Sequence, residues 1–243
     1  MYNFLISGGI AIAAIAVIIF AAGPSSWWWA ILVGLLLFGG SFLLISRIVM
    51  KKVLEVMETA NRDLQAQRVE KSIRELKEAF RYGKWQMYVE GQINAQIGMI
   101  YYLKRDFSTA FPYLEKAFAK NWVAMSMLAI TFMKRNKRDK MKETFEKAAQ
   151  WSPKESLLWA LYAYCWTECE DMGQAKAVLE RGLKKLPGDE KLKANLEALQ
   201  EGKKMKMKVY GDMWLQFHLE RQSVVMKQQM AAMGGMKRRI VRR

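Results

Sequence analysis

The chain has 243 residues, of which 39 are Lys or Arg and 23 are Asp or Glu, so its formal net charge is +16. Its length and its 52% content of apolar residues exclude a mainly disordered chain, and two Cys are too few for a small fold held together by disulfides. The first 46 residues carry no Asp, Glu, Lys or Arg side chain, a distribution typical of a membrane segment rather than of a soluble domain.

Residues 1–46 are predicted to form a transmembrane helical hairpin. Residues 4–22 and 27–46 are each long enough to cross a hydrocarbon core of about 30 Å. The Gly-Pro-Ser-Ser sequence at 23–26 predicts a tight turn, and the three Trp at 27–29 are expected at headgroup level. Small residues are expected where the two helices approach closely; these are Gly8, Gly9, Ala13, Gly34, Gly39 and Gly40.

The charges that flank the hairpin predict its orientation. Arg47, Lys51 and Lys52 follow the second span, whereas the turn has no charge. Because basic residues favour the cytoplasmic side, both termini and the rest of the chain are expected in the cytoplasm, with the hairpin in a bacterial-type inner membrane. A cleaved signal peptide is the alternative for the first span, but no basic residue precedes that span.

Residues 47–85 are predicted to form an amphipathic linker helix. The segment has no Pro or Gly before residue 83, and its apolar residues recur every three or four positions. A step of five between Leu64 and Val69 shifts this apolar stripe. A dimeric coiled coil and a stalk that packs on the following domain are both compatible with the pattern, and the shortness of the two runs favours the stalk.

Residues 86–201 contain a repeated pattern. Gly98, Ala129 and Ala163 are each followed three residues later by a bulky aromatic residue, namely Tyr101, Phe132 and Trp166. Further positions in register are Ala110, Met141 and Ala175, then Leu114, Phe145 and Leu179, then Ala117, Ala148 and Gly182, with Pro153 and Pro187 at 34 residues' distance. This pattern resembles the tetratricopeptide repeat family over roughly residues 91–189, followed by a capping helix.

The resemblance implies an all-α chain in which about three helix hairpins form a solenoid behind the transmembrane hairpin and the linker helix. It also implies a groove on the first helices that binds a peptide or an amphipathic helix of a partner protein. The predicted groove residues are Met99, Tyr102, Ile130, Met133 and Tyr164. The Lys, Asn and Arg side chains with which some family members clamp a chaperone's terminal carboxylate are nearly absent. Taken singly, each of these apolar residues is also typical of a helix core.

No catalytic residue, cofactor or metal is predicted, and the chain is not expected to be an enzyme. Cys165 and Cys169 lie one helical turn apart, but the only His is the distant His218, so three or four converging metal ligands are missing from the pattern. Phosphate-binding glycine loops and nucleophile motifs are absent.

Residues 202–243 form a basic, amphipathic C-terminal tail with 11 basic and two acidic residues, which accounts for more than half of the net charge. Three alternatives remain open for this tail: its apolar face packs on the solenoid, it lies on the membrane, or it touches nucleic acid. The residues expected to contact an anionic surface are Lys237, Arg238, Arg239, Arg242 and Arg243.

Together these features predict a membrane-anchored scaffold that binds partner proteins through a cytoplasmic groove. The alternative functions are a membrane-attached binder of nucleic acid or anionic lipid that acts through its tail, and an accessory subunit of a membrane complex.

Overall fold

The computed structural model describes residues 2–220, and the regular secondary structure of this part of the chain is entirely helical. It contains eleven α-helices, three short 3₁₀ helices and no strand within those residues. The helices are grouped into two compact units, each of which is described by itself. The first consists of residues 2–101 with 108–118, and the second of residues 102–107 with 119–220.

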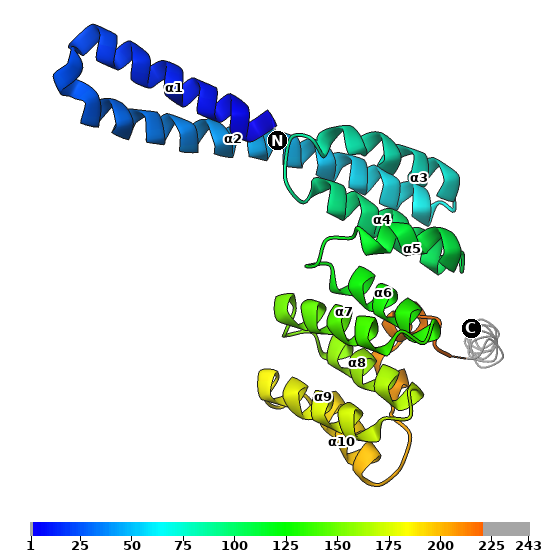
Figure 1. The fold of residues 1–243 in the computed structure, drawn as a ribbon. Helices are drawn as coiled ribbons and strands as arrows, with labels where there is room; N and C mark the ends of the chain where they lie inside the picture. Colours follow the sequence, from blue (N-terminus) through cyan, green and yellow to red (C-terminus); the bar gives the residue numbers. More distant parts are fainter. Residues whose placement is uncertain (1, 221–243) are drawn as a thin grey trace, which may run out of the picture. The chain divides into compact units, whose positions relative to one another are not determined.

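The first unit begins with an antiparallel hairpin of two apolar helices (Figure 1). Helix α1 (Tyr2–Ala22) and the first half of α2 (Trp27–Gln65) pack side by side, joined by a 3₁₀ turn at Pro24–Ser26. Gly23 opens this turn at a φ of 83°, a conformation that favours glycine, and Ser26 Oγ donates to its carbonyl at 2.6 Å. Both helices are long and apolar enough to cross a membrane.

Only one of the small residues predicted at the helix crossing lies there. A Cβ added to Gly34 would lie 2.6 Å from Ile15, whereas a Cβ added to Gly8, Gly9, Gly39 or Gly40 would have no atom within 4 Å, and Ala13 is exposed. Besides Gly34, the buried crossing positions are Ser7, Ala11 and Ala30. The prediction for the other glycines and Ala13 was therefore wrong, because the rotation of each helix about its axis is set by the contact between them.

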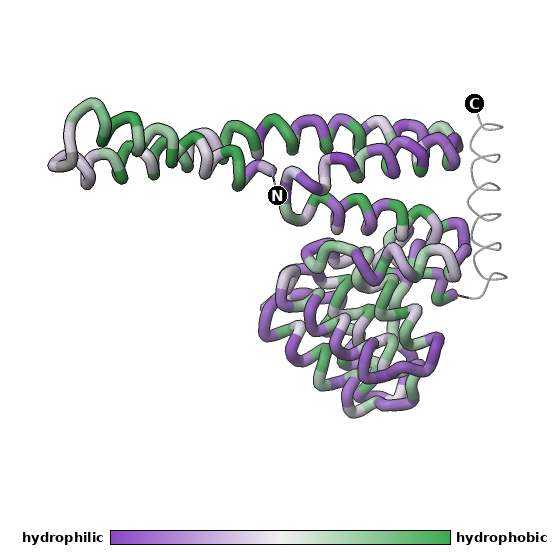
Figure 2. Tube along the Cα trace, turned by 45° about the horizontal axis from the view of Figure 1, so that its top comes forward, coloured by the Kyte–Doolittle hydropathy of each residue, from purple (hydrophilic) through white to green (hydrophobic). Residues whose placement is uncertain are grey.

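Helix α2 continues without interruption for 39 residues, from the apolar hairpin into the charged part of the chain. Figure 2 shows this change along the helix, from hydrophobic to hydrophilic residues. The predicted linker helix therefore does not begin as a separate helix, because its first residues belong to α2. It is also interrupted at residues 66–68, where the apolar stripe shifts, and Gln67 adopts a φ of 60°. Helix α3 (Val69–Glu78) then packs back on α2 and ends in a 3₁₀ turn at Ala79–Tyr82.

The hairpin of α2 and α3 shares an apolar core with α4 (Val89–Leu103). The buried members of this core are Val49, Val53, Ala60, Ile73, Leu76, Ala79, Val89, Ile93, Ile97 and Ile100. Helix α5 (Phe107–Glu115) packs closely on α4, because a Cβ added to Gly98 would lie 2.8 Å from the Leu114 side chain. The stalk alternative, in which the linker packs on the following domain, agrees with this core.

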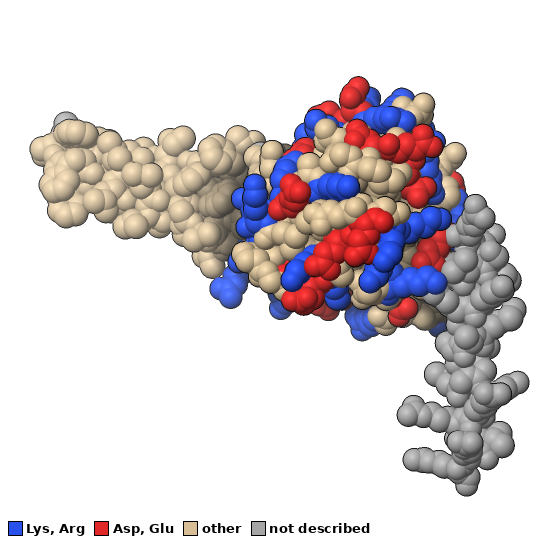
Figure 3. Space-filling view, turned by 90° about the horizontal axis from the view of Figure 1, so that it is seen from below, with Lys and Arg blue, Asp and Glu red and all other residues tan. Residues whose placement is uncertain are grey.

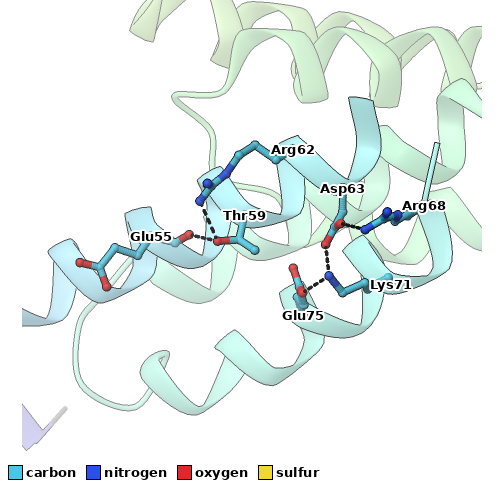
Figure 4. A network of polar contacts seen from close by, with 7 residues as sticks. All are labelled: Glu55, Thr59, Arg62, Asp63, Arg68, Lys71 and Glu75. Carbon is cyan, nitrogen blue, oxygen red and sulfur yellow. Dashed lines mark hydrogen bonds and ion pairs between the residues drawn. The ribbon is translucent and has the colours of Figure 1, made fainter. Parts of the chain in front are cut away.

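A charged cluster closes the turn between α2 and α3 (Figure 4). Asp63 is 7% exposed, and its carboxylate pairs with Lys71 Nζ at 2.8 Å and with Arg68 at 3.7 Å. Lys71 also reaches Glu75 at 3.5 Å, one helical turn further along α3. The hydrogen bond from Lys71 lowers the pKa of Asp63, so the carboxylate stays charged and holds the two helices together at neutral pH.

The second unit contains two helix pairs and a final helix. Helices α6 (Trp122–Lys134) and α7 (Arg138–Trp151) form one pair, and α8 (Ser156–Glu168) and α9 (Met172–Lys185) form the next. Helix α8 also contacts α6 and α7, and α10 (Glu190–Gln200) packs on α8 and α9. Side-chain caps begin three of these helices, with Asn121, Asp171 and Asp189 each accepting a hydrogen bond from a backbone amide three residues on.

The turns between paired helices repeat one geometry along the chain. Gln67, Arg105, Asn136 and Glu170 all have φ between 56° and 65°, and each lies two residues after the first helix of its pair. The amide after three of them closes a bond of 2.8–3.0 Å to a carbonyl five residues back, namely Arg68 to Asp63, Lys137 to Phe132 and Asp171 to Trp166. The pair α2–α3 therefore ends its first helix as the later pairs do.

Candidate protein-binding face

The predicted groove residues differ in exposure. Tyr102 and Ile130 are 1% and 0% exposed, whereas Met99, Met133 and Tyr164 are half-buried. Met99 belongs to the first unit and the other four to the second. Only the four residues of the second unit are therefore considered together as one face.

The face made by the first helices of the second unit is covered by the chain itself. We call residues 203–220 the C-terminal segment; it contains a 3₁₀ turn at Met207–Tyr210 and the short helix α11 (Asp212–Leu215). Three of its apolar side chains, Met207, Trp214 and Phe217, are at most 3% exposed. Of the three alternatives for the tail, packing on the helices is thus observed for this part of it.

Aromatic contacts fix the distal half of the C-terminal segment. Trp214 packs edge-on against Tyr164, with ring centroids 4.9 Å apart, and the Tyr102 hydroxyl donates to the Phe217 carbonyl at 2.9 Å. His218 stacks on the Tyr102 ring at 5.8 Å. Two predicted groove residues, Tyr102 and Tyr164, therefore bind an aromatic segment of the same chain.

The proximal half is held by polar contacts to α8 and α10. The Lys206 amide donates to Asn195 Oδ1 at 2.6 Å, and the hydroxyls of Tyr210 and Ser156 lie 3.1 Å apart. Between the two halves, Gly211 has φ 59° and ψ −140°, a combination that is essentially restricted to glycine. This bend allows the chain to leave α10 and continue across the first helices.

Burial determines the electrostatics of this face. It raises the pKa of the Tyr102 phenol and that of Tyr210, the latter to about 12, so both phenols stay neutral and can donate hydrogen bonds. Burial also lowers the pKa of Lys134 and of His218, and the nearby Arg105 lowers both further. The Lys134 ammonium lies 4.7 Å from the centroid of the Phe107 ring, where the aromatic face partly compensates its loss of water.

The other residues singled out in the sequence lie elsewhere. Cys165 and Cys169 are buried free thiols, and burial raises the pKa of both. Residues 2–220 contain no group of three or more His, Cys, Asp or Glu side chains placed to hold a metal ion. The predicted anionic-surface residues Lys237, Arg238, Arg239, Arg242 and Arg243 lie outside the described residues.

The sequence left packing of the tail on the solenoid open as one of three alternatives, and it did not predict which residues of the tail and of the helices meet. The signal for this alternative is the aromatic spacing of Tyr210, Trp214 and Phe217 directly after the last helix pair and its final helix. Comparison with known proteins adds no relative, since no family model, curated protein or solved structure matches the chain.

Proposed function

We propose that this protein is a membrane-anchored adaptor of the tetratricopeptide repeat type, which binds a partner protein on the first-helix face of its second unit. The observation that carries the proposal is the docking of Trp214 and Phe217 on Tyr164 and Tyr102. A face that holds an aromatic segment through ring packing and one backbone carbonyl has the chemistry to hold a similar segment of another protein.

The membrane anchor is supported by the exposure of apolar side chains around α1 and the first half of α2. Phe20, Ile12, Leu36 and Leu43 are between 68% and 94% exposed. Figure 3 shows the hairpin without a charged side chain on the face in view. A helix that is apolar on all sides and not covered by protein is stable in lipid, not in water. We place the hairpin in a bacterial-type inner membrane, with both termini in the cytoplasm, on the basis of the basic residues at 47, 51 and 52.

The repeat type is supported by equivalent positions in successive helix pairs. Ala129, Ala148, Ala163 and Ala175 are completely buried, and a Cβ added to Gly182 would lie 2.9 Å from the Trp159 ring. Small residues at these positions let the two helices of a pair approach closely.

The pair α2–α3 extends this pattern toward the membrane. Ala60 is 2% exposed, and Ser72, Leu76 and Ala79 are 1% exposed or less. Their spacing equals that of Gly98, Ala110, Leu114 and Ala117. We therefore count α2–α3 as a further repeat, whose first helix is continuous with the membrane span. Asp63 occupies the position at which the later pairs carry a bulky aromatic residue.

The C-terminal segment competes with the partner in this proposal. Its own docking keeps Tyr102 covered in the unbound protein. A partner can bind only when the segment is displaced, so the free energy of displacing it reduces the apparent affinity for the partner. Weakening the segment should then increase partner binding without changing the face.

Photo-crosslinking in native membranes tests this function. With benzoylphenylalanine in place of Tyr164, we expect an internal cross-link to the C-terminal segment and an adduct to a defined partner protein. Trp214→Ala should increase the partner adduct at the expense of the internal one. Benzoylphenylalanine at Lys142, which is exposed on α7, is the matched control and should give neither. An internal cross-link without any partner adduct, also after Trp214→Ala, would refute the adaptor function.

The alternative function, binding of nucleic acid or anionic lipid by the tail, draws support from four exposed lysines of the C-terminal segment: Lys203, Lys204, Lys206 and Lys208. Their replacement by Gln separates the two functions, because salt-sensitive binding would be lost while the partner adduct at position 164 would persist.

A further inference from the structure

A pocket of about 250 Å³ lies in the first unit, where the start of α1 meets the loop between α3 and α4. Its walls combine aromatic rings and two side-chain amides, and they include Phe4, Phe42, Trp85, Tyr88, Asn3 and Gln86. Figure 1 shows this loop beside the beginning of α1. All of these residues belong to the first unit.

Two contacts attach the loop to the first turn of α1. The Tyr2 amide donates to the Lys84 carbonyl at 3.0 Å, and the rings of Tyr2 and Trp85 meet edge-on with centroids 5.6 Å apart. Across the hairpin, the side-chain Nδ2 of Asn3 donates to Ser46 Oγ on α2 at 2.7 Å. Ser46 directly precedes Arg47, the first charged residue of the chain. The pocket therefore lies at the level where the apolar hairpin ends and the charged helices begin, which is the headgroup level of a bilayer that contains the hairpin.

Two side chains that line the pocket each carry a buried acceptor oxygen without a hydrogen-bond partner among the described residues. Asn3 is 2% exposed, and its Nδ2 is directed to Ser46 and to the Phe42 carbonyl, which leaves Oδ1 without a donor. Gln86 Oε1 is buried and equally lacks a donor. Because an unsatisfied buried acceptor destabilises the fold, a ligand that donates hydrogen bonds to these two side chains would stabilise this end of the hairpin.

The aromatic walls add a preference for positive charge. Trp85 and Tyr88 line the pocket, and aromatic rings attract cations. A primary ammonium group also has three donors for the two acceptors. Next to the pocket, Lys84 is exposed and can reach a phosphate, while the exposed Phe4 and Leu43 continue as an apolar surface for acyl chains. An ammonium group, a phosphate and acyl chains are the three parts of a phosphatidylethanolamine.

We propose that this pocket binds the headgroup of a phospholipid with a primary ammonium group, of the phosphatidylethanolamine class. The proposal rests on the membrane anchor of the proposed function. It implies that the lipid fixes the loop between α3 and α4 to the start of α1, and so attaches the first helix pairs to the membrane surface. A choline headgroup has the cation but no donor, and a glycerol headgroup has donors but no cation, so both should bind more weakly.

Lipid competition on the purified full-length protein tests this site. Native mass spectrometry from detergent, with phosphatidylethanolamine, phosphatidylcholine and phosphatidylglycerol of identical acyl chains, should show about tenfold preference for phosphatidylethanolamine, the effect of one hydrogen bond to a charged group. Gln86→Leu should reduce this preference at least severalfold. Ser46→Ala removes the interhelical partner of Asn3 but leaves both acceptors, and it should retain the preference.

Each other outcome overturns the proposal. Equal retention of the ethanolamine and choline lipids, a preference for phosphatidylglycerol, or an unchanged preference in a folded Gln86→Leu protein would exclude the ammonium site. Carbonate extraction of the native membranes separates this failure from that of the proposed function. A protein that is released by carbonate lacks the membrane anchor, whereas one that is retained without lipid preference lacks only the site.

Discussion

Replacement of Trp214 by Ala is the most direct test of how the C-terminal segment is held. The Trp214 side chain is 2% exposed, packs edge-on against Tyr164 and donates its indole N–H to Glu220 at 2.9 Å. Truncation of a buried Trp to Ala costs about 3–5 kcal/mol. The substitution should weaken the docking of the C-terminal segment and leave the helix pairs stable, because α6 to α10 pack on each other.

The expected magnitude follows from this cost. A loss of about 3 kcal/mol corresponds to a roughly hundredfold increase in the equilibrium constant for opening of the segment. Amide hydrogen exchange measures this directly, since exchange of a protected amide reports local opening. The Lys206 amide, bonded to Asn195 Oδ1 at 2.6 Å, and the amides of Trp214 and Phe217 should all exchange faster by up to this factor.

A matched control lies in the same segment. Val209 is 49% exposed, so Val209→Ala removes a side chain of the segment without removing a buried contact and should change exchange by less than about threefold. Exchange in Trp214→Ala equal to that in Val209→Ala would refute the view that ring packing holds the segment. Faster exchange throughout α6 to α10 would refute the view that the segment is docked on an independently stable face.

Two further predictions concern the helix pairs. Gly182→Ala should destabilise the protein by about 1–3 kcal/mol despite the gain in helix propensity, because the new Cβ would lie 2.9 Å from the Trp159 ring. In the same helix Gly173→Ala should not, because its Cβ would make only an ordinary contact, 3.5 Å from Asp171 Oδ1, and thermal unfolding by circular dichroism compares the two. Glu146→Gln should cost about 1 kcal/mol, because it breaks a bidentate pair with the partly exposed Arg181 at 2.7 Å. The hydrogen bonds from Arg181 lower the pKa of Glu146 in the folded protein, so its contribution is complete above its unfolded pKa near 4.5 and disappears as the pH falls through the lower folded pKa. The difference in melting temperature between wild type and Glu146→Gln should therefore vanish in acid, and a constant difference down to about pH 2 would contradict this.

The sequence predicted the helices well where their signal is local. Small residues at Gly98, Ala129 and Ala163 with constant spacing predicted close helix crossings, and these positions are buried. The apolar residues of α1 and α2 likewise predicted a hairpin, because length and composition decide whether a helix is able to span a bilayer.

The earliest helix pair shows where the repeated pattern in the sequence is incomplete. Ala60 and Ser72 have the spacing of the later pairs, but Asp63 replaces the bulky aromatic residue that made those pairs recognisable. In the structure, an ion pair with Lys71 takes the place of the aromatic packing in the later pairs. The replacement of an aromatic residue by Asp63 can be understood only when Lys71, its partner across the turn, is known.

An apolar hairpin and a series of helix pairs can thus be read from the sequence, since helix periodicity, turns and hydrophobicity depend on neighbouring residues. Which glycine lies at the helix crossing and where the C-terminal segment packs became evident only in the folded chain. The bond between Tyr102 and Phe217 joins residues 115 positions apart, and the proposed lipid pocket unites Asn3 with Gln86. Contacts of this kind depend on how preformed helices pack together, and no local pattern of residues encodes that packing.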